Sequence, residues 1–398
     1  MRILLCLAVL LACTAPARAG WEGGAIKLGV LTDLSGVYSD ATGKGAILAA
    51  RMAVEDCLAA DCKGMKIDLV SADHQNKPDV ALAIARDWID NQGVDALVDM
   101  SNAAIQLAMP GLVRDKNRVA IFAGGTARLS GDACMPGHIV QWMWDTYVQV
   151  NGVAARLTKP GTKWYMVTAD YALGRQFEED AKTLVSAAGG QVIGVARHPF
   201  PSTDMSSFLL QAQASGADVI ALGNAGGDTL NSIKTAHEFG LGDRQKLAAL
   251  YISVLDIKGL GLPVAVGTLL TEGFYWDVDP GTRAFSQRFF AQQQAMPSQI
   301  QAGLYSATLH YLKSAAAART REAGAVIREM HTLPIADDVV RHAHLRADGR
   351  MVHDFYVFQV KHPAESTGPW DLYKLVDTIP GDQAFRPMTP GLCPHPLP

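Results

Sequence analysis

Short apolar segments alternate with amphipathic helical segments, and this alternation limits the possible fold more than any other feature of the chain. Residues 26–31, 65–70 and 119–122 have the composition of buried strands. Between them, Ile47, Ala50, Val54 and Leu58 recur at the helical period, and Pro78 opens a second helix at its first turn. A second set of the same kind covers residues 163–252. The pattern predicts α/β lobes, each with a parallel sheet covered by helices on both faces.

Two neighbouring strands end in turns of small or polar residues. The first turn follows residues 96–100 and consists of Ser101, Asn102 and Ala103. The second follows residues 119–122 and consists of Gly124, Gly125 and Thr126. Ser or Asn before a helical segment is an N-cap signature. Such turns expose backbone N–H groups and helix N-termini, which attract anions. Because ligands of open α/β sheets bind beyond the carboxyl ends of the strands, these turns are predicted to form half of an anion clamp.

The rest of the chain predicts connecting and covering elements. Residues 141–153 contain three large aromatic residues and are predicted to form a helix. Residues 267–277 are expected to cross between lobes, residues 282–294 and 298–318 to form helices, and residues 353–360 to form a strand. The proline- and glycine-rich residues after Lys361 are expected to be irregular.

Length, charge and motifs exclude several classes of function. A chain of 398 residues suggests two domains. The net charge of −4 and the lack of basic runs argue against a nucleic-acid partner. The sequence contains no GxSxG, GxxxxGK[ST] or HExxH motif, so neither catalysis nor a cofactor is expected. His342, His344 and His353 lack the accompanying ligands of a metal site, and none is predicted.

The N-terminus has the organisation of an export signal. Arg2 precedes an apolar stretch at residues 3–12, and Ala17-Arg18-Ala19 supplies a small-x-small cleavage site. Residues 1–19 are therefore predicted to be a signal peptide, and the mature protein to be exported. Residues 10–13 loosely resemble a lipobox, so anchoring at Cys13 is the less favoured alternative.

Four cysteines remain after the leader, which is an even number in an oxidising compartment. They are Cys57, Cys62, Cys134 and Cys393, and sequence alone allows three connectivities. The short separation of Cys57 and Cys62 favours a local bridge. That bridge would leave Cys134 with Cys393, tying the C-terminal tail to the first half of the chain.

The chain resembles the type I periplasmic solute-binding proteins of ABC importers, the group around the branched-chain amino-acid binding proteins. The residues that carry the resemblance are 32–38, 43–45, 52–56, 73–78, 168–172 and 223–229. It implies two doubly wound lobes joined by a hinge of several strands. Lobe 1 would comprise residues 25–143 and 277–348, lobe 2 residues 144–276 and 349–380, with residues 381–398 as a tail.

The resemblance also implies the ligand residues and partners. The two turns would hold a ligand carboxylate, and the further contacts would come from Tyr38 in lobe 1, from Tyr171, Asn224 and Asp228 in lobe 2, and from Tyr275 and Trp276 in the crossing segment. The subgroup that binds aromatic and other organic acids is the most similar. The protein would act as a monomer that delivers its ligand to a membrane permease.

Two alternatives remain open. Amino-acid-binding members hold the ligand ammonium with an acid near residues 250–254, and this chain has none there. That difference disfavours an amino acid, although branched-chain amino acids, amides and other organic acids stay as alternatives. The remote alternative is a secreted hydrolase, for which Ser101 with His74 and Asp73 is the one candidate trio.

Overall fold

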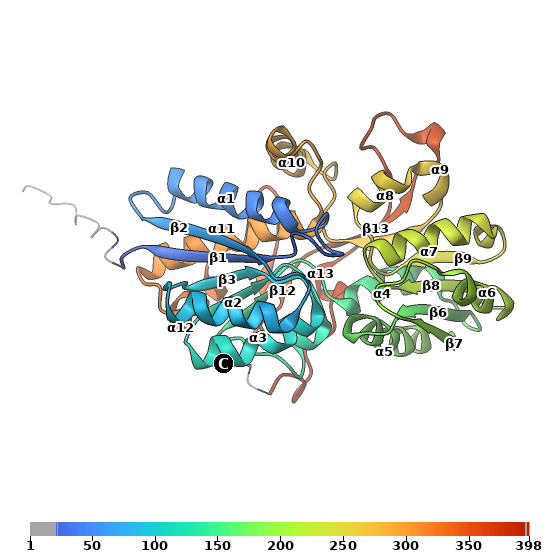
Figure 1. Ribbon diagram of the computed structural model, residues 1–398, viewed down its shortest axis with the longest axis horizontal. Coiled ribbons are helices and arrows are strands. Elements are labelled where there is room, and N and C mark those ends of the chain that lie inside the picture. Colours follow the sequence, from blue (N-terminus) through green and yellow to red (C-terminus); the bar gives the residue numbers. More distant parts are fainter. Residues whose placement is uncertain (1–20, 22, 395, 398) are drawn as a thin grey trace, which may run out of the picture.

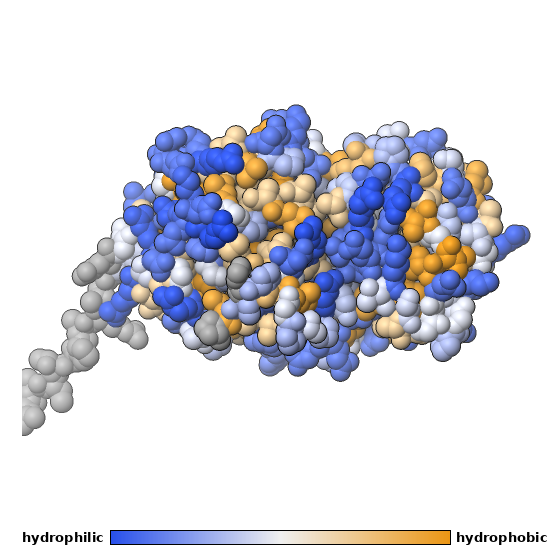
Figure 2. All heavy atoms as spheres, turned by 90° about the horizontal axis from the view of Figure 1, so that it is seen from below, coloured by the Kyte–Doolittle hydropathy of each residue, from blue (hydrophilic) through white to orange (hydrophobic). Residues whose placement is uncertain are grey.

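The computed structural model of the chain describes residues 21, 23–394 and 396–397, and it consists of two α/β lobes joined by a narrow connection (Figure 1). The predicted signal peptide and Cys13 lie outside these residues. Hydrophilic and hydrophobic residues are interspersed over the face of both lobes that Figure 2 shows.

The first lobe contains a five-stranded sheet in the order β2-β1-β3-β4-β5, with all neighbours parallel. Its strands are β1 (Ile26–Thr32), β2 (Ile67–Asp73), β3 (Ala96–Asp99), β4 (Val119–Phe122) and β5 (Ile139–Gln141). Every residue of β3 and β4 is buried, which explains their continuous apolar runs.

Helices cover both faces of this sheet. They are α1 (Gly43–Ala59), α2 (Pro78–Asp90), α3 (Ala103–Asp115), α10 (Pro280–Gln293), α11 (Gln299–Ala318) and α12 (Ala323–Thr332), with the short 3₁₀ helix η1 (Ala127–Ser130) after β4. Helix α11 packs along α1 and is buried over most of its length. A segment from the last third of the chain therefore completes the first lobe (Figure 1).

The second lobe contains a seven-stranded sheet in the order β14-β13-β10-β9-β8-β6-β7. Five strands are parallel, namely β6 (Lys163–Ala169), β7 (Gln191–His198), β8 (Val219–Gly223), β9 (Lys246–Ala249) and β10 (Leu269–Glu272). Strands β13 (Phe355–Val360) and β14 (Tyr373–Ile379) extend it antiparallel. Its helices are α4 (Thr146–Leu157), α5 (Ala172–Ala187), α6 (Ser206–Ala214), α7 (Gly227–Glu238), α8 (Val254–Leu260) and α9 (Leu262–Ala265).

Two local predictions are wrong. The aromatic segment is not helical from residue 141, because β5 ends at Gln141 and α4 starts only at Thr146, where Asp145 caps it by accepting a hydrogen bond from the Val148 N–H. Trp142 and Trp144 lie in the link between the lobes. The residues after Lys361 are not wholly irregular either, because β14 pairs with β13 there.

The chain passes between the lobes after β5, after β10 and before β13, and the tail then returns to the first lobe. After α13 (Gly381–Ala384), a disulfide joins Cys393 to Cys134, and a second one joins Cys57 to Cys62. This is the connectivity that the cysteine spacing favours. The short strands β11 (His344–Leu345) and β12 (Met351–Val352) form a separate hairpin beside the link.

Candidate functional site

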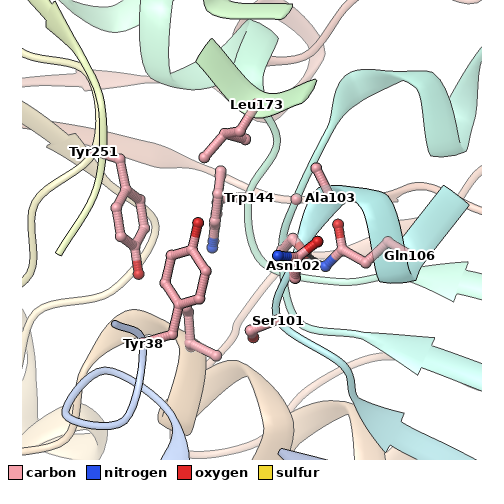
Figure 3. Close-up of a pocket in the computed structure, with 11 residues that line it drawn as sticks. Tyr38, Ser101, Asn102, Ala103, Gln106, Trp144, Leu173 and Tyr251 are labelled. Atoms are coloured by element: carbon pink, nitrogen blue, oxygen red, sulfur yellow. Dashed lines mark hydrogen bonds between the residues drawn. The ribbon is translucent and has the colours of Figure 1, made fainter. Parts of the chain in front are cut away.

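A small cavity lies between the lobes, at the carboxyl ends of β1, β3 and β4. Figure 3 shows Tyr38, Trp144 and Tyr251 grouped near one another, with Ser101, Asn102 and Gln106 across from them. The lining residues are Tyr38, Ser101, Asn102, Ala103, Gln106, Gly124, Gly125, Trp144, Leu173, Tyr251 and Ile300. Six of the twelve residues predicted for the site therefore lie together, and none of the lining residues is charged at neutral pH.

The first turn of the predicted clamp links β3 to α3. Asn102 caps α3, as the sequence predicts, because its Oδ1 accepts hydrogen bonds from the N–H groups of Ala104 and Ile105. The amide Nδ2 of Asn102 donates to Asn76 Oδ1 at 2.5 Å. The Ser101 hydroxyl is hydrogen-bonded to Asp99 Oδ1 instead of to a ring nitrogen of His74.

The second turn requires glycine because side chains approach it closely. A Cβ atom on Gly124 would lie 1.9 Å from Trp144 Nε1, and one on Gly125 would lie 1.8 Å from Gln106 Oε1. The Gln106 Nε2 group donates to the Gly124 carbonyl at 2.6 Å. The two glycines thus let an indole and an amide side chain reach the cavity.

The Thr126 side chain has another role. Its hydroxyl accepts a hydrogen bond from the Arg128 N–H and caps η1, and its carbonyl accepts one from Gln141 Nε2. Thr126 is 1% exposed and is not among the lining residues.

Two aromatic side chains with unpartnered polar atoms line the cavity. The rings of Trp144 and Tyr251 lie 4.8 Å apart between centroids. Within the described part of the chain, neither Trp144 Nε1 nor the Tyr251 hydroxyl has a hydrogen-bond partner, although both are buried. Burial raises the pKa of Tyr251 well above its usual value, so its hydroxyl stays protonated and remains a donor.

Trp144 is placed by a distant residue. Arg350 is fully buried, and its Nη atoms donate to the carbonyls of Trp142, Met143 and Trp144 at 2.7–3.2 Å. Its guanidinium also lies 4.0 Å from the centroid of the Phe385 ring. The β12 side of the link therefore holds the segment that carries Trp144.

Tyr38 and Tyr171 join the two lobes at the edge of this cavity. Their hydroxyl oxygens lie 2.5 Å apart, and the Tyr171 ring stacks on Phe200 with centroids 4.2 Å apart. Burial raises the pKa of both tyrosines, so the pair stays neutral. Only Tyr38 of the pair lines the cavity, so Tyr171 is connected to the site by its hydrogen bond to Tyr38.

Asn224 and Asp228 belong to a buried polar network of the second lobe. The Asn224 side chain bonds to Ser232 and Thr229, and Asp228 Oδ1 accepts from the Ser202 N–H at 3.0 Å. Asp228 Oδ2 lies 3.5 Å from His198 Nδ1. Neither residue is among those that line the cavity.

Tyr275 and Trp276 do not line the cavity and instead form hydrogen bonds within the second lobe. The Tyr275 hydroxyl and Trp276 Nε1 both donate to the carbonyl of Trp370, at 2.7 and 2.8 Å. The Tyr275 ring packs on Tyr373 in the core of the second lobe. The structure therefore does not bring these two residues to the cavity.

Sequence reasoning missed Gln106, Trp144, Leu173, Tyr251 and Ile300 among the lining residues. Two of them carried a usable signal, because Trp144 and Tyr251 each follow a strand of a parallel sheet, where ligand contacts collect. The acid nearest in sequence to Tyr251, Asp256, accepts hydrogen bonds from the Ser253 N–H and hydroxyl in a capping box.

Other kinds of site find no support in the described residues. No helix there is long and apolar enough to span a membrane. No cluster of His, Cys, Asp and Glu in the same part of the chain has the arrangement of a metal site.

The periplasmic binding protein family model matches residues 25–368. A periplasmic binding protein from Burkholderia mallei is 42% identical over 91% of this chain and 96% of its own, with a TM-score of 0.86. A branched-chain amino acid ABC transporter periplasmic ligand-binding protein from Burkholderia xenovorans LB400 is 40% identical over 91% and 97%, with a TM-score of 0.82.

A more distant relative shares the fold. It is an R. palustris ABC transporter solute-binding protein in complex with benzoate, 19% identical over 89% of this chain and 96% of its own, with a TM-score of 0.77. A comparison with curated proteins found no match.

Proposed function

Since the chain belongs to the periplasmic binding protein family and is a solute-binding component of an ABC transporter, we propose that its solute is a small carboxylic acid, preferably an aromatic one. The cavity between the lobes would hold this acid. Proteins of this family are binding proteins, so the chain is not the hydrolase kept as a remote alternative.

The observation that supports a carboxylate is the set of unused donors around the glycine turn. Trp144 Nε1 and the Tyr251 hydroxyl lack partners, and no hydrogen bond from the N–H groups of Gly124 and Gly125 is found among the described residues. A carboxylate oxygen accepts several such bonds, and each bond to a charged group contributes about 1.5–3 kcal/mol.

The walls of the cavity favour a flat, partly apolar ligand. The Trp144 and Tyr251 rings, with Leu173 and Ile300, offer apolar surface beside the donors. Aromatic side chains recognise rings by stacking and edge contacts. An R. palustris solute-binding protein with the same fold is in complex with benzoate, a ligand of this class.

Capture would proceed by closure of the two lobes over the ligand. The Tyr38–Tyr171 hydrogen bond crosses between the lobes and would form as they close. Changing the closed fraction from 1:99 to 99:1 requires about 5.5 kcal/mol of preference for the closed form. Two charge-assisted bonds together with one ring contact are enough to supply it.

The family implies a periplasmic location and a permease partner. We further propose that residues 1–19 are removed on export and that the mature protein acts as a monomer. Branched-chain amino acids remain the alternative ligands, because the B. xenovorans relative is named for them. The engagement of Asp256 in its capping box disfavours them, since it leaves that acid less able to bind an ammonium group.

The test is a thermal-shift screen of the mature protein with benzoate, 4-hydroxybenzoate, aliphatic acids, branched-chain amino acids, amides and sugars. Hits would be followed by calorimetry for affinity and stoichiometry. We expect aromatic carboxylic acids to raise the melting temperature and to bind one-to-one. A response to leucine-like amino acids alone would overturn the proposed ligand class.

A further inference from the structure

Asp99 lies directly behind the ligand cavity. It is the last residue of β3, it is 0% exposed, and its Oδ1 is hydrogen-bonded to the hydroxyl of Ser101, which lines the cavity. Its Oδ2 has no partner among the described residues. Asp99 and Met100 have φ values of 81° and 57°, a left-handed conformation that non-glycine residues rarely adopt. Strained backbone of this kind collects at functional sites.

The Ser101 hydroxyl has a single hydrogen to donate. If Asp99 is ionised, its carboxylate can only accept, so Ser101 donates to Asp99 and presents only lone pairs to the cavity. If Asp99 is protonated, it can donate to Ser101 Oγ, and the Ser101 hydrogen becomes free to bond a ligand. The charge state of Asp99 therefore determines whether Ser101 attracts or repels an anion.

We propose that Asp99 takes up one proton from solvent when a carboxylate enters the cavity, and that it is the positioning residue that turns the Ser101 hydroxyl toward the ligand. This inference rests on the proposed function, because it assumes an anionic ligand beside Ser101. On this proposal, binding consumes one proton. The protein with ionised Asp99 combines with the ligand anion and one proton from solvent to give the complex, in which Asp99 is neutral.

The surroundings of Asp99 favour protonation of its carboxylate. Burial raises its pKa to about 7. The hydrogen bond from Ser101 and the nearby hydroxyls of Thr32 and Thr42 only partly offset this rise, while the charge of Asp33 raises the pKa further. A ligand anion beside Ser101 would act in the same direction as Asp33.

The other titratable groups near Asp99 are engaged or stay neutral. Asp33, on the loop after β1, accepts hydrogen bonds from the Gly36 and Tyr38 N–H groups. Beyond it, Asp73 at the end of β2 accepts from the Leu34 N–H and the Ser35 hydroxyl. Burial lowers the pKa of His74 and keeps it neutral.

On the cleft side, the two nearby tyrosines do not compete for this proton. Burial raises the pKa of both Tyr38 and Tyr251, so each carries its own proton throughout the neutral range. Asp99 is therefore the group expected to change charge when an anion binds.

The experiment is calorimetry of benzoate binding at pH 8 in phosphate and in Tris, two buffers whose different ionisation enthalpies reveal proton uptake. If the thermal-shift screen selects another carboxylic acid, that acid replaces benzoate. We expect uptake of close to one proton per ligand, and an affinity that falls about tenfold per pH unit above pH 7. Binding with the same apparent enthalpy in both buffers would overturn the inference.

Asp99→Asn provides the matched variant, because its amide donates permanently to Ser101 Oγ. It should bind the acid without proton uptake and with little pH dependence, whereas Asp68→Asn, at a partly exposed position of β2, should behave as the wild type. If Asp99→Asn does not fold, the two-buffer comparison of the wild type decides alone. An acid that binds without proton uptake refutes only this inference, but failure of every carboxylic acid to bind refutes the proposed function as well.

Discussion

The indole of Trp144 packs against the phenol ring of Tyr251 in the wall of the cavity, with centroids 4.8 Å apart and planes inclined by 31°. Trp144 belongs to the link after β5, and Tyr251 follows β9 of the second lobe. Each ring brings one buried donor without a partner among the described residues. The most direct tests of the site concern these two atoms.

Removing either donor should weaken ligand binding. Trp144→Phe and Tyr251→Phe keep a ring but delete the N–H or O–H, so the Kd for the selected acid should rise about 10- to 100-fold, measured by calorimetry. Trp164→Phe and Tyr373→Phe are matched controls, because Trp164 Nε1 and the Tyr373 hydroxyl are also buried without partners but lie outside the cavity lining. Equal losses in all four variants would contradict the assignment.

A side chain at position 124 should abolish ligand binding without unfolding the protein. In Gly124→Ala the added Cβ would lie 1.9 Å from Trp144 Nε1, so the indole must move out of its position in the cavity. We expect ligand affinity to be lost while the circular dichroism spectrum is retained. Gly111→Ala is the control, because a Cβ there meets no atom within 4 Å, and it should leave affinity unchanged.

Thr126→Ala should reduce stability and leave binding intact. The hydroxyl caps η1 through the Arg128 N–H, and loss of such a cap costs about 1 kcal/mol. Chemical denaturation should show this loss while the Kd stays the same. Ser101→Ala should show the opposite pattern, since Ser101 lines the cavity. A weaker affinity in Thr126→Ala would instead support the direct ligand contact that the sequence predicts.

The Cys134–Cys393 disulfide should stabilise the protein more than the local one. It joins residues separated by 259 positions, whereas Cys57 and Cys62 are separated by 5. On the chain-entropy model, Cys134→Ser with Cys393→Ser should lower the free energy of unfolding by about 5.5 kcal/mol, and the local pair by less. Non-reducing peptide mapping checks the pairing, and two free thiols at Cys134 and Cys393 would disprove it.

Local sequence signals were sufficient to predict the features that depend on residues close together in the chain. The alternation of strands and helices predicts two α/β lobes, because each strand and helix is encoded by its own periodicity. The small-residue turns after β3 and β4 line the cavity because carboxyl ends of parallel strands meet at one edge of the sheet. Spacing alone favoured the observed disulfides.

The choice among aromatic residues was made only by the tertiary structure. Trp144 reaches the cavity because the buried guanidinium of Arg350 holds its segment, and Gly124 leaves room for its ring. Tyr275 and Trp276, equally aromatic, donate instead to the Trp370 carbonyl. The hydrogen bonds among these contacts join residues about 90 to 200 positions apart. The sequence therefore determined the lobes and one side of the cleft, whereas hydrogen bonds between distant segments determined which side chains face the ligand, since local periodicity carries no information about such partners.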